Sequence, residues 1–343
     1  MEKQRLTASD EALLEVKNLE TAFDIDGEYY NAVDDVSFSV KKGEILGIVG
    51  ESGCGKSVLS LSVMHLLPKG IGKVMGGEVY FDGKRIDQLS TKEINKIRGK
   101  DIAMIFQEPM TSLNPVFTIG YQLTEALFNH MKISKQKARI EAIQLLKSVG
   151  ISRAEQVVDE YPHQLSGGMR QRVMIAMAIA CQPKLLIADE PTTALDVTIQ
   201  AQILELLKDI QKANDMSIIL ITHDLGVVAE MCDRVLVMYA GKIVEKATVE
   251  DLFFDPKHPY TKLLLGSIPK LEEEVEELSS IEGIVPSLQN MPKVGCKFAN
   301  RCPFAKPECF TVTPELGPEG NNDHEVACLL YDSSWPKEGK SAS

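Results

Sequence analysis

The sequence predicts an α/β fold with a mainly parallel sheet at its core, and three observations predict it. Short apolar runs recur along the chain with helical stretches between them, which is typical of parallel strands covered by helices. A glycine-rich stretch (50–57) ends the first of these runs, and two β-rich segments precede that run. Four of the seven cysteines gather between residues 296 and 328. We therefore expect an N-terminal antiparallel β subdomain before the core and a small C-terminal Cys-rich appendage after it.

The first elements follow from local signals. Residues 1–11 are polar, and we expect a flexible N-terminus. Two β-rich runs, LLEVKNLETAFDI and YYNAVDDVSFSV, then flank Asp26-Gly27, a turn signal that predicts a hairpin. A buried strand is predicted at 44–50 and a helix from Lys56. The other core strands are expected at 101–106, 184–189, 217–222 and 235–240.

A helical insertion is predicted at about 109–164, because this stretch holds segments such as SKQKARIEAIQLLKSVG and no strong strand signal. The domain that contains it is expected to span 12–255. Beyond that point proline becomes frequent, and an acidic run follows at 272–277. We expect a linker at 256–295, the Cys-rich appendage at 296–330 and a flexible tail at 331–343.

The composition excludes several classes of protein. Asp and Glu outnumber Lys and Arg by 49 to 37, and a net charge of −12 argues against binding to nucleic acid backbones. The longest apolar run, at 173–181, is far shorter than the about 20 residues of a membrane-spanning helix. The N-terminus lacks the apolar stretch of a secretory signal. We therefore expect the chain to stay in the cytoplasm, where thiols are reduced and its cysteines form no disulfides.

The glycine-rich stretch GESGCGKS fits the phosphate-binding pattern G-x-x-x-x-G-K-[ST], and it lies between a predicted strand and a predicted helix. Glycines let backbone N–H groups and the helix N-terminus point at an anion. Lys56 adds a positive charge near the β and γ phosphates, and the Ser57 hydroxyl can bind Mg²⁺. The alternative is a glycine-rich turn with an accidental GKS. The expected nucleotide contacts are Gly50, Ser52, Gly53, Cys54, Gly55, Lys56, Ser57 and Val58.

Two carboxylates follow a later apolar run, KLLIADEP, at Asp189 and Glu190. In a doubly wound sheet the carboxyl ends of the strands form the ligand crevice. We expect Asp189 to bind Mg²⁺ and Glu190 to polarise the attacking water as a general base. The alternative is an acidic helix cap before Pro191. Together with the glycine-rich loop, these carboxylates indicate a nucleotide hydrolase.

The segment LSGGMRQRV (165–173) narrows the class, because a serine and two glycines before a helix make a second anion site. Here the chain resembles the ATP-binding cassette (ABC) ATPases, a family of P-loop NTPases, with LSGGM as the signature sequence. Met169 departs from the Gln that is usual in this signature. The resemblance implies that Ser166, Gly167 and Gly168 act on the nucleotide held by a second cassette.

Other motifs match this family in the expected order. Gln107, in IFQEP, resembles the Q-loop glutamine that senses Mg²⁺. Asp196, in TALD, resembles the D-loop aspartate that faces the opposite subunit. His223, in LITHD, resembles the switch histidine that contacts the γ-phosphate. The resemblance implies that ATP closes two cassettes head to tail and that hydrolysis lets them open.

An aromatic side chain of the N-terminal hairpin is expected to stack on the adenine. Phe23 fits the spacing of the family, and Tyr29 and Tyr30 are the other candidates. Packing against the sheet is the alternative role of Phe23.

Four cysteines near the C-terminus, Cys296, Cys302, Cys309 and Cys328, have the spacing C-x5-C-x6-C-x18-C. Four thiols in a short proline-containing stretch of a reduced protein indicate a soft metal ion. The spacing matches neither the close pairs of structural zinc sites nor the bacterial ferredoxin pattern, so it does not name the metal. Four unbound structural cysteines are the alternative.

The stretch HPYTKLLLGSIP (258–269), followed by these cysteines, is similar to the ATPase subunits of oligopeptide and dipeptide importers. The resemblance implies a [4Fe–4S] cluster on the four cysteines, with zinc as the alternative. It also implies an ATP- and Mg²⁺-dependent ATPase at the cytoplasmic face of the membrane. Its partners would be a paralogous cassette or a second copy, two transmembrane permease subunits and, indirectly, an extracytoplasmic peptide-binding protein. An importer for nickel or another small solute, or a non-transport ABC ATPase, is the alternative.

Overall fold

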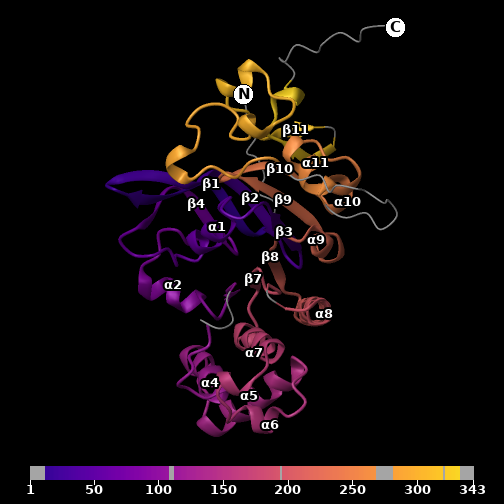
Figure 1. Ribbon diagram of the computed structural model, residues 1–343. Coiled ribbons are helices and arrows are strands. Elements are labelled where there is room, and N and C mark those ends of the chain that lie inside the picture. The colour runs from indigo at the N-terminus through magenta and orange to yellow at the C-terminus, as the bar shows by residue number, and fades with distance from the viewer. Residues whose placement is uncertain (1–11, 108–111, 194, 268–280, 320, 333–343) are drawn as a thin grey trace, which may run out of the picture.

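A computed structural model describes residues 12–107, 112–193, 195–267, 281–319 and 321–332, and Figure 1 shows two sheets with helices below and the C-terminal segment above. The expected flexible N-terminus (1–11), the acidic run (272–277) and residues 333–343 of the expected tail lie outside the described residues. Among the described residues, no helix combines the length and the apolar character needed to cross a membrane.

The smaller sheet is antiparallel, with strand order β2-β1-β4-β5. Its strands are β1 (Ala12–Ile25), β2 (Glu28–Lys41), β4 (Gly72–Phe81) and β5 (Lys84–Arg85). The predicted hairpin is confirmed: Ile25 pairs with Glu28, and Asp26 and Gly27 both have the positive φ that such a turn requires. The sequence did not reveal β4, whose outer half is only partly buried and lacks a clean apolar alternation.

The larger sheet has the strand order β11-β12-β10-β9-β3-β8-β7-β6. The five predicted core strands are confirmed, and they pair in parallel. They are β3 (Ile45–Val49), β6 (Ile102–Ile105), β7 (Leu185–Asp189), β8 (Ser217–Ile221) and β9 (Arg234–Tyr239). Every residue of β3, β7 and β8 is buried, which explains why these strands appear as continuous apolar runs.

The same sheet continues into the C-terminal segment through antiparallel strands. These are β10 (Lys242–Thr248), β11 (Gly317–Glu319) and β12 (Asn321–Val326). Glu245 of β10 pairs with Val326 of β12, so the Cys-rich appendage is hydrogen-bonded to the core sheet. The appendage thereby covers an edge that would otherwise expose unpaired backbone groups.

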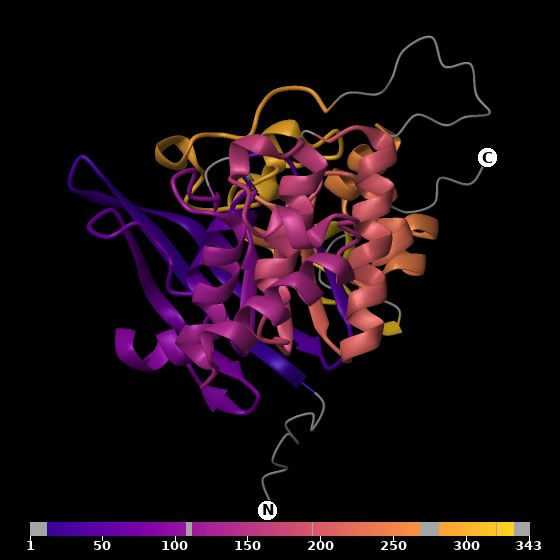
Figure 2. The same cartoon turned by 90° about the horizontal axis from the view of Figure 1, so that it is seen from below.

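Helices cover the large sheet, and Figure 2 shows several of them in front of it when the molecule is seen from below. The helical insertion holds α4 (Ile119–His130), α5 (Lys135–Ser148), α6 (Ala154–Val157) and the short η1 (Pro162–Gln164). Within 109–164, the described residues contain no strand, as predicted. The other helices are α1 (Lys56–Val63), α2 (Thr91–Ile97), α7 (Gly167–Ile179), α8 (Val197–Asn214), α9 (Leu225–Met231), α10 (Val249–Phe254), α11 (Pro259–Gly266) and the short turns η2 (Leu288–Asn290), η3 (Ala299–Arg301), η4 (Pro307–Phe310) and η5 (Leu329–Tyr331).

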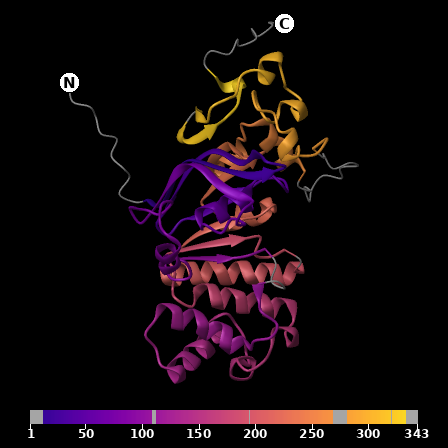
Figure 3. The same ribbon diagram turned by 90° about the vertical axis from the view of Figure 1, so that its left-hand side faces the viewer.

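The two faces of the large sheet belong to different apolar cores. In β8, Ile218 and Leu220 pack with the helical side of the molecule, whereas Ile219 and Ile221 pack with the small sheet. A third core joins the sheet to the C-terminal segment, and the stacked layers can be followed in Figure 3. In that third core the ring centroids of Tyr239 and Phe298 lie 5.1 Å apart, an edge-on contact that contributes about 0.5–1.5 kcal/mol beyond burial.

Candidate active site

The glycine-rich loop connects β3 to α1 and needs glycine at two positions. Gly50 has φ 150° and Gly55 has φ 101°. A Cβ atom at Gly50 would lie 2.2 Å from the carbonyl oxygen of Met238, and one at Gly55 would lie 2.4 Å from that of Ala32. Both contacts are far too short, so the loop is held against neighbouring backbone that only glycine can approach.

Lys56 begins helix α1 and is almost completely buried beneath this loop. Its Nζ donates hydrogen bonds to the carbonyl oxygens of Gly50 at 2.7 Å and Glu51 at 3.1 Å. The loop carbonyls thus fix the ammonium group, and the first-turn N–H groups of α1 also attract anions. This combination can hold the phosphates of a nucleotide.

Asp189 ends β7 and faces the start of α1. Its carboxylate accepts a hydrogen bond from the Ser57 hydroxyl, and burial raises its pKa. Its Oδ1 is buried and has no hydrogen-bond partner among the described residues. A buried, unpartnered carboxylate oxygen beside a hydroxyl is a donor set that suits Mg²⁺, so the residues present fit this ion.

Glu190 stands next to Asp189 but holds a different set of contacts. Its carboxylate accepts hydrogen bonds from Gln107 Nε2 at 3.0 Å and Thr193 Oγ1 at 2.9 Å. His223 Nδ1 lies 3.3 Å from its Oε1. The backbone of Glu190 has φ 47°, which is uncommon for a non-glycine residue and costs of order 1 kcal/mol. The fold therefore holds this carboxylate at the end of the strand in spite of strain.

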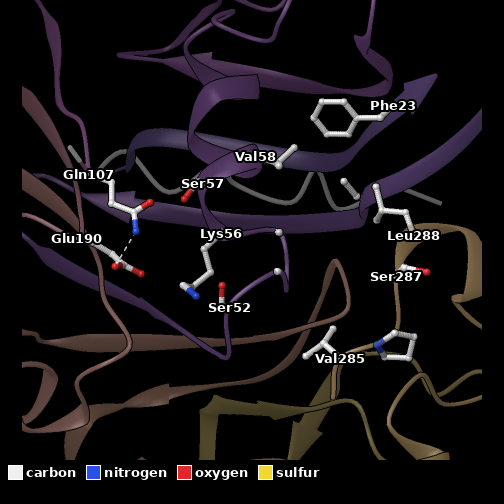
Figure 4. Close-up of a pocket in the computed structure, with 14 residues that line it drawn as sticks. Phe23, Ser52, Lys56, Ser57, Val58, Gln107, Glu190, Val285, Ser287 and Leu288 are labelled. Carbon is white, nitrogen blue, oxygen red and sulfur yellow. Dashed lines mark hydrogen bonds between the residues drawn. The ribbon is translucent and has the colours of Figure 1, made fainter. Parts of the chain in front are cut away.

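Lys56, Ser57, Gln107 and Glu190 line one cavity of about 450 Å³, whereas Asp189 and His223 are not part of its lining. Figure 4 shows Lys56, Gln107 and Glu190 at one side and Phe23 and Leu288 at the other. The cavity is thus polar where phosphates and water would react and apolar where a base would lie. Its lining consists of Phe23, Ala32, Ser52, Gly53, Gly55, Lys56, Ser57, Val58, Gln107, Glu190, Val285, Pro286, Ser287 and Leu288.

The other aromatic candidates do not line this cavity. Tyr29 is 52% exposed, and the hydroxyl of Tyr30 donates to Glu28 at the turn of the hairpin. Cys54 is also absent from the lining, because its side chain is buried under the loop, where burial raises the pKa of its thiol. Of the candidates for adenine stacking, the structure therefore places Phe23 at the cavity.

The C-terminal segment supplies contacts that sequence reasoning missed. The guanidinium of Arg301 donates to both carboxylate oxygens of Glu51, at 2.7 and 2.9 Å, and the N–H of Glu51 donates to the hydroxyl of Tyr260 at 2.8 Å. The stretch 285–288 forms part of the cavity wall. No local signal links Glu51 to Arg301, because the two residues are 250 positions apart.

The signature residues lie away from this cavity. Ser166 caps α7 and accepts a hydrogen bond from Met169 N, and Gly167 and Gly168 form the first turn. Asp196 caps α8 in the same way, through Ile199 N. None of these four residues is among the described residues that line the cavity. This placement separates them from the phosphate-binding loop of their own chain.

The four C-terminal cysteines converge on a second, much smaller cavity of about 20 Å³, which His258 also lines. All four are free thiols, and burial, together with the other cysteines, raises the pKa of Cys296 to about 11 and that of Cys328 to about 12. In the described part of the chain, however, no group of three or more His, Cys, Asp or Glu side chains is arranged as a preformed metal site. The expected [4Fe–4S] cluster is therefore not supported by this geometry.

Comparison with known proteins agrees with the fold. The ABC transporter family profile matches residues 33–193, and the profile for the C-terminal region of oligopeptide/dipeptide transporters matches residues 244–309. A dimeric, post-hydrolysis structure of the ATP-binding cassette MJ0796, bound to ADP and Pi, covers 69% of this chain and 98% of its own, with a TM-score of 0.62 and 29% identity. The chain is an ATPase of the ABC class.

Relatives over nearly the full length narrow this class. The oligopeptide transport ATP-binding protein AppD of Bacillus subtilis (strain 168) is 55% identical over 95% of this chain and 99% of its own length. The dipeptide transport ATP-binding protein DppD of Escherichia coli (strain K12) is 50% identical over 89% of this chain and 93% of its own. The chain belongs to the family of oligopeptide and dipeptide transport ATP-binding proteins.

Proposed function

We propose that this chain is the ATP-hydrolysing subunit of an importer for oligopeptides or dipeptides. The observation that carries the proposal is the single cavity that gathers Lys56, Glu190 and Gln107 in a chain with full-length peptide-transport relatives. The specific peptide is selected by other subunits, because this cavity has the polarity of a nucleotide site.

The reaction follows from the positions of the side chains. Lys56 and the N–H groups of the loop bind the β and γ phosphates, and Phe23 stacks on the adenine. Glu190 accepts a proton from the attacking water. Gln107 and His223 hold the Glu190 carboxylate in place. Ser57 and Asp189 would hold Mg²⁺, which would neutralise charge on the phosphates.

Two cassettes are needed in this proposal, because Ser166, Gly167 and Gly168 lie away from the cavity of their own chain. They would contact the γ-phosphate held by a partner, which is a paralogous ATPase or a second copy, and Asp196 would face that partner. ATP then closes the pair and hydrolysis opens it. Two transmembrane permease subunits would carry the chain at the cytoplasmic face of the membrane and receive peptide from an extracytoplasmic binding protein.

We also propose that Cys296, Cys302, Cys309 and Cys328 hold a metal centre. The support is that all four cysteines line one small cavity of about 20 Å³. The resemblance to peptide importers favours a [4Fe–4S] cluster. Zinc is the second candidate, and the small cavity favours it, because a single ion needs less rearrangement of the loop than a cluster.

The test is co-purification of the tagged chain under anaerobic conditions with the products of adjacent genes, followed by reconstitution in lipid vesicles and metal analysis. We expect ATP turnover that rises with a peptide-loaded binding protein, together with uptake of labelled peptide. Turnover that responds to nickel instead, or to DNA, would contradict peptide import. Zinc without iron would favour zinc, and neither metal would contradict the metal centre.

A further inference from the structure

Two apolar side chains line the active-site cavity without packing into a core. Phe23 and Leu288 are both only partly buried, and neither packs into the apolar cores that the described residues form. Figure 4 shows them at the same end of the cavity, with Leu288 below the ring of Phe23. Apolar surface that is left open to water favours contact with an apolar ligand. Both side chains are therefore available to the flat faces of a base.

The ring of Phe23 is backed by a glycine. Phe23 of β1 pairs with Gly72 of β4, and a Cβ atom at Gly72 would lie 3.1 Å from Phe23 Cε1. The ring therefore rests against a position that has no side chain. Because Phe23 also lines the cavity, the rest of the ring is open to the space where a base would lie.

Leu288 belongs to a stretch of chain that is anchored on both sides. Val285 before it and Met291 after it pack against the third core. Leu288 itself begins the short turn η2, and Asn290 of this turn donates a hydrogen bond from its Nδ2 to Ser287 Oγ at 3.0 Å. These contacts give Leu288 a defined place at the cavity wall.

One guanidinium joins this stretch to the phosphate-binding loop. Arg301, whose side chain is 7% exposed, donates to the carbonyl oxygens of residues 281–283 at distances of 2.8 to 3.3 Å. The same guanidinium donates to both carboxylate oxygens of Glu51. The wall that carries Leu288 is thus tied to the loop that binds the phosphates, and a ligand that occupies both ends of the cavity must fit between them.

We propose that Leu288 is a specificity-determining residue that covers the face of the adenine opposite Phe23. This inference rests on the proposed nucleotide site, and it gives the base a second wall from the C-terminal segment. The base then lies between an aromatic ring and an aliphatic side chain, while Lys56 binds the phosphates at the other end. Such a slot favours a flat base attached to a polyphosphate, and it adds nothing to the binding of the phosphates alone.

The test is calorimetric titration of the full-length chain with AMP-PNP, an ATP analogue that is not hydrolysed, and with inorganic tripolyphosphate, which lacks the base. In Leu288→Ala the base loses part of its apolar cover, so the affinity for AMP-PNP should fall by roughly 5–20-fold while that for tripolyphosphate stays unchanged. Leu288→Met keeps the apolar volume and should bind AMP-PNP within about twofold of the wild type. Ile284→Ala is the matched control, because Ile284 lies in the same stretch, is 86% exposed and does not line the cavity.

Three results would contradict this account. An unchanged affinity of Leu288→Ala for AMP-PNP, with a wild type that binds both ligands, would overturn the role of Leu288 and leave the nucleotide site standing. Equal losses of affinity for AMP-PNP and tripolyphosphate would show that Leu288 shapes the phosphate-binding loop and does not cover the base. A wild type that binds neither ligand would overturn the nucleotide site itself, on which the inference rests.

Discussion

At the scale of single residues, the neighbours Asp189 and Glu190 have different contacts, which suit their carboxylates to different roles. Asp189 is buried against Ser57 with one oxygen unpartnered, whereas Glu190 is held by Gln107, Thr193 and His223. The first arrangement suits a cation and the second suits a base beside water. Adjacent positions in a strand-end turn can thus serve two steps of one reaction.

Glu190→Gln should separate binding from hydrolysis. The amide keeps the shape and most hydrogen bonds of the carboxylate but cannot accept a proton, so turnover should fall by roughly 10²-fold or more while ATP affinity is retained. Steady-state hydrolysis and equilibrium ATP binding measure the two quantities. Glu205→Gln, on the exposed face of α8, is the control, and wild-type turnover in Glu190→Gln would remove Glu190 from the role of base.

Lys56→Ala should weaken nucleotide binding itself. The ammonium that now contacts two loop carbonyls would be absent when the phosphates arrive, and we expect ATP affinity to fall at least about tenfold. Calorimetric titration gives the dissociation constant. The exposed Lys92→Ala on α2 controls for net charge, and an unaltered affinity in Lys56→Ala would contradict the phosphate-binding role of the loop.

Phe23→Ala tests whether the apolar side of the cavity binds the adenine and not the phosphates. Loss of a base–aromatic stack is worth about 1–3 kcal/mol, so ATP affinity should drop whereas the affinity for inorganic tripolyphosphate should not. Competition binding with ATP and with tripolyphosphate measures the two affinities separately. Tyr29→Ala should behave as the wild type, and if it instead shows the selective loss, the adenine contact belongs to Tyr29.

At the scale of elements, the C-terminal segment is part of the nucleotide site. The segment 285–288 forms a wall of the cavity, and Arg301 and Tyr260 fix Glu51 of the phosphate-binding loop. Arg301 directly precedes Cys302, and Tyr260 follows His258 by two residues. The thiol cavity and the phosphate-binding loop are therefore joined through two short connections, of which Tyr260 is fully buried.

Arg301→Ala should therefore reduce ATP affinity several-fold, although Arg301 lies outside the residues matched by the ABC transporter profile. It removes a bidentate ion pair from a nearly buried site, which also lowers the free energy of unfolding by about 1–3 kcal/mol. A double-mutant cycle with Glu51→Ala gives the coupling energy of the pair. Additive effects of the two substitutions would show that this contact does not shape the loop.

At the scale of the whole molecule, the residues that we propose act on the nucleotide of a partner do not line the cavity of their own chain. Ser166 and Asp196 cap α7 and α8 and present their N-termini elsewhere. A helix N-terminus with free N–H groups binds phosphate well only when the phosphate is brought to it. A second cassette with bound nucleotide is the simplest way to bring a phosphate to these helix N-termini.

The hydrolysis-deficient Glu190→Gln chain, purified with its partner cassette, should therefore associate more tightly when ATP and Mg²⁺ are added. Light scattering should show a heavier species that disappears when Ser166→Arg blocks the signature surface. Ser148→Arg, on the exposed face of α5, is the control for added bulk and charge. A mass that does not respond to nucleotide would contradict the two-cassette mechanism.

The sequence alone determined the features whose chemistry is local: the hairpin at Asp26-Gly27, the five parallel core strands, the glycine-rich loop and the carboxylates at the end of β7. Periodicity and turn preference act within a few residues, so they can be recognised from the chain. Only the tertiary structure brought Arg301 to Glu51, the segment 285–288 to Phe23 and His258 to the four cysteines. Those contacts join positions that local propensity does not relate, because they form when the C-terminal segment adds strands to the sheet edge and buries Tyr260 and Phe298 against Tyr239.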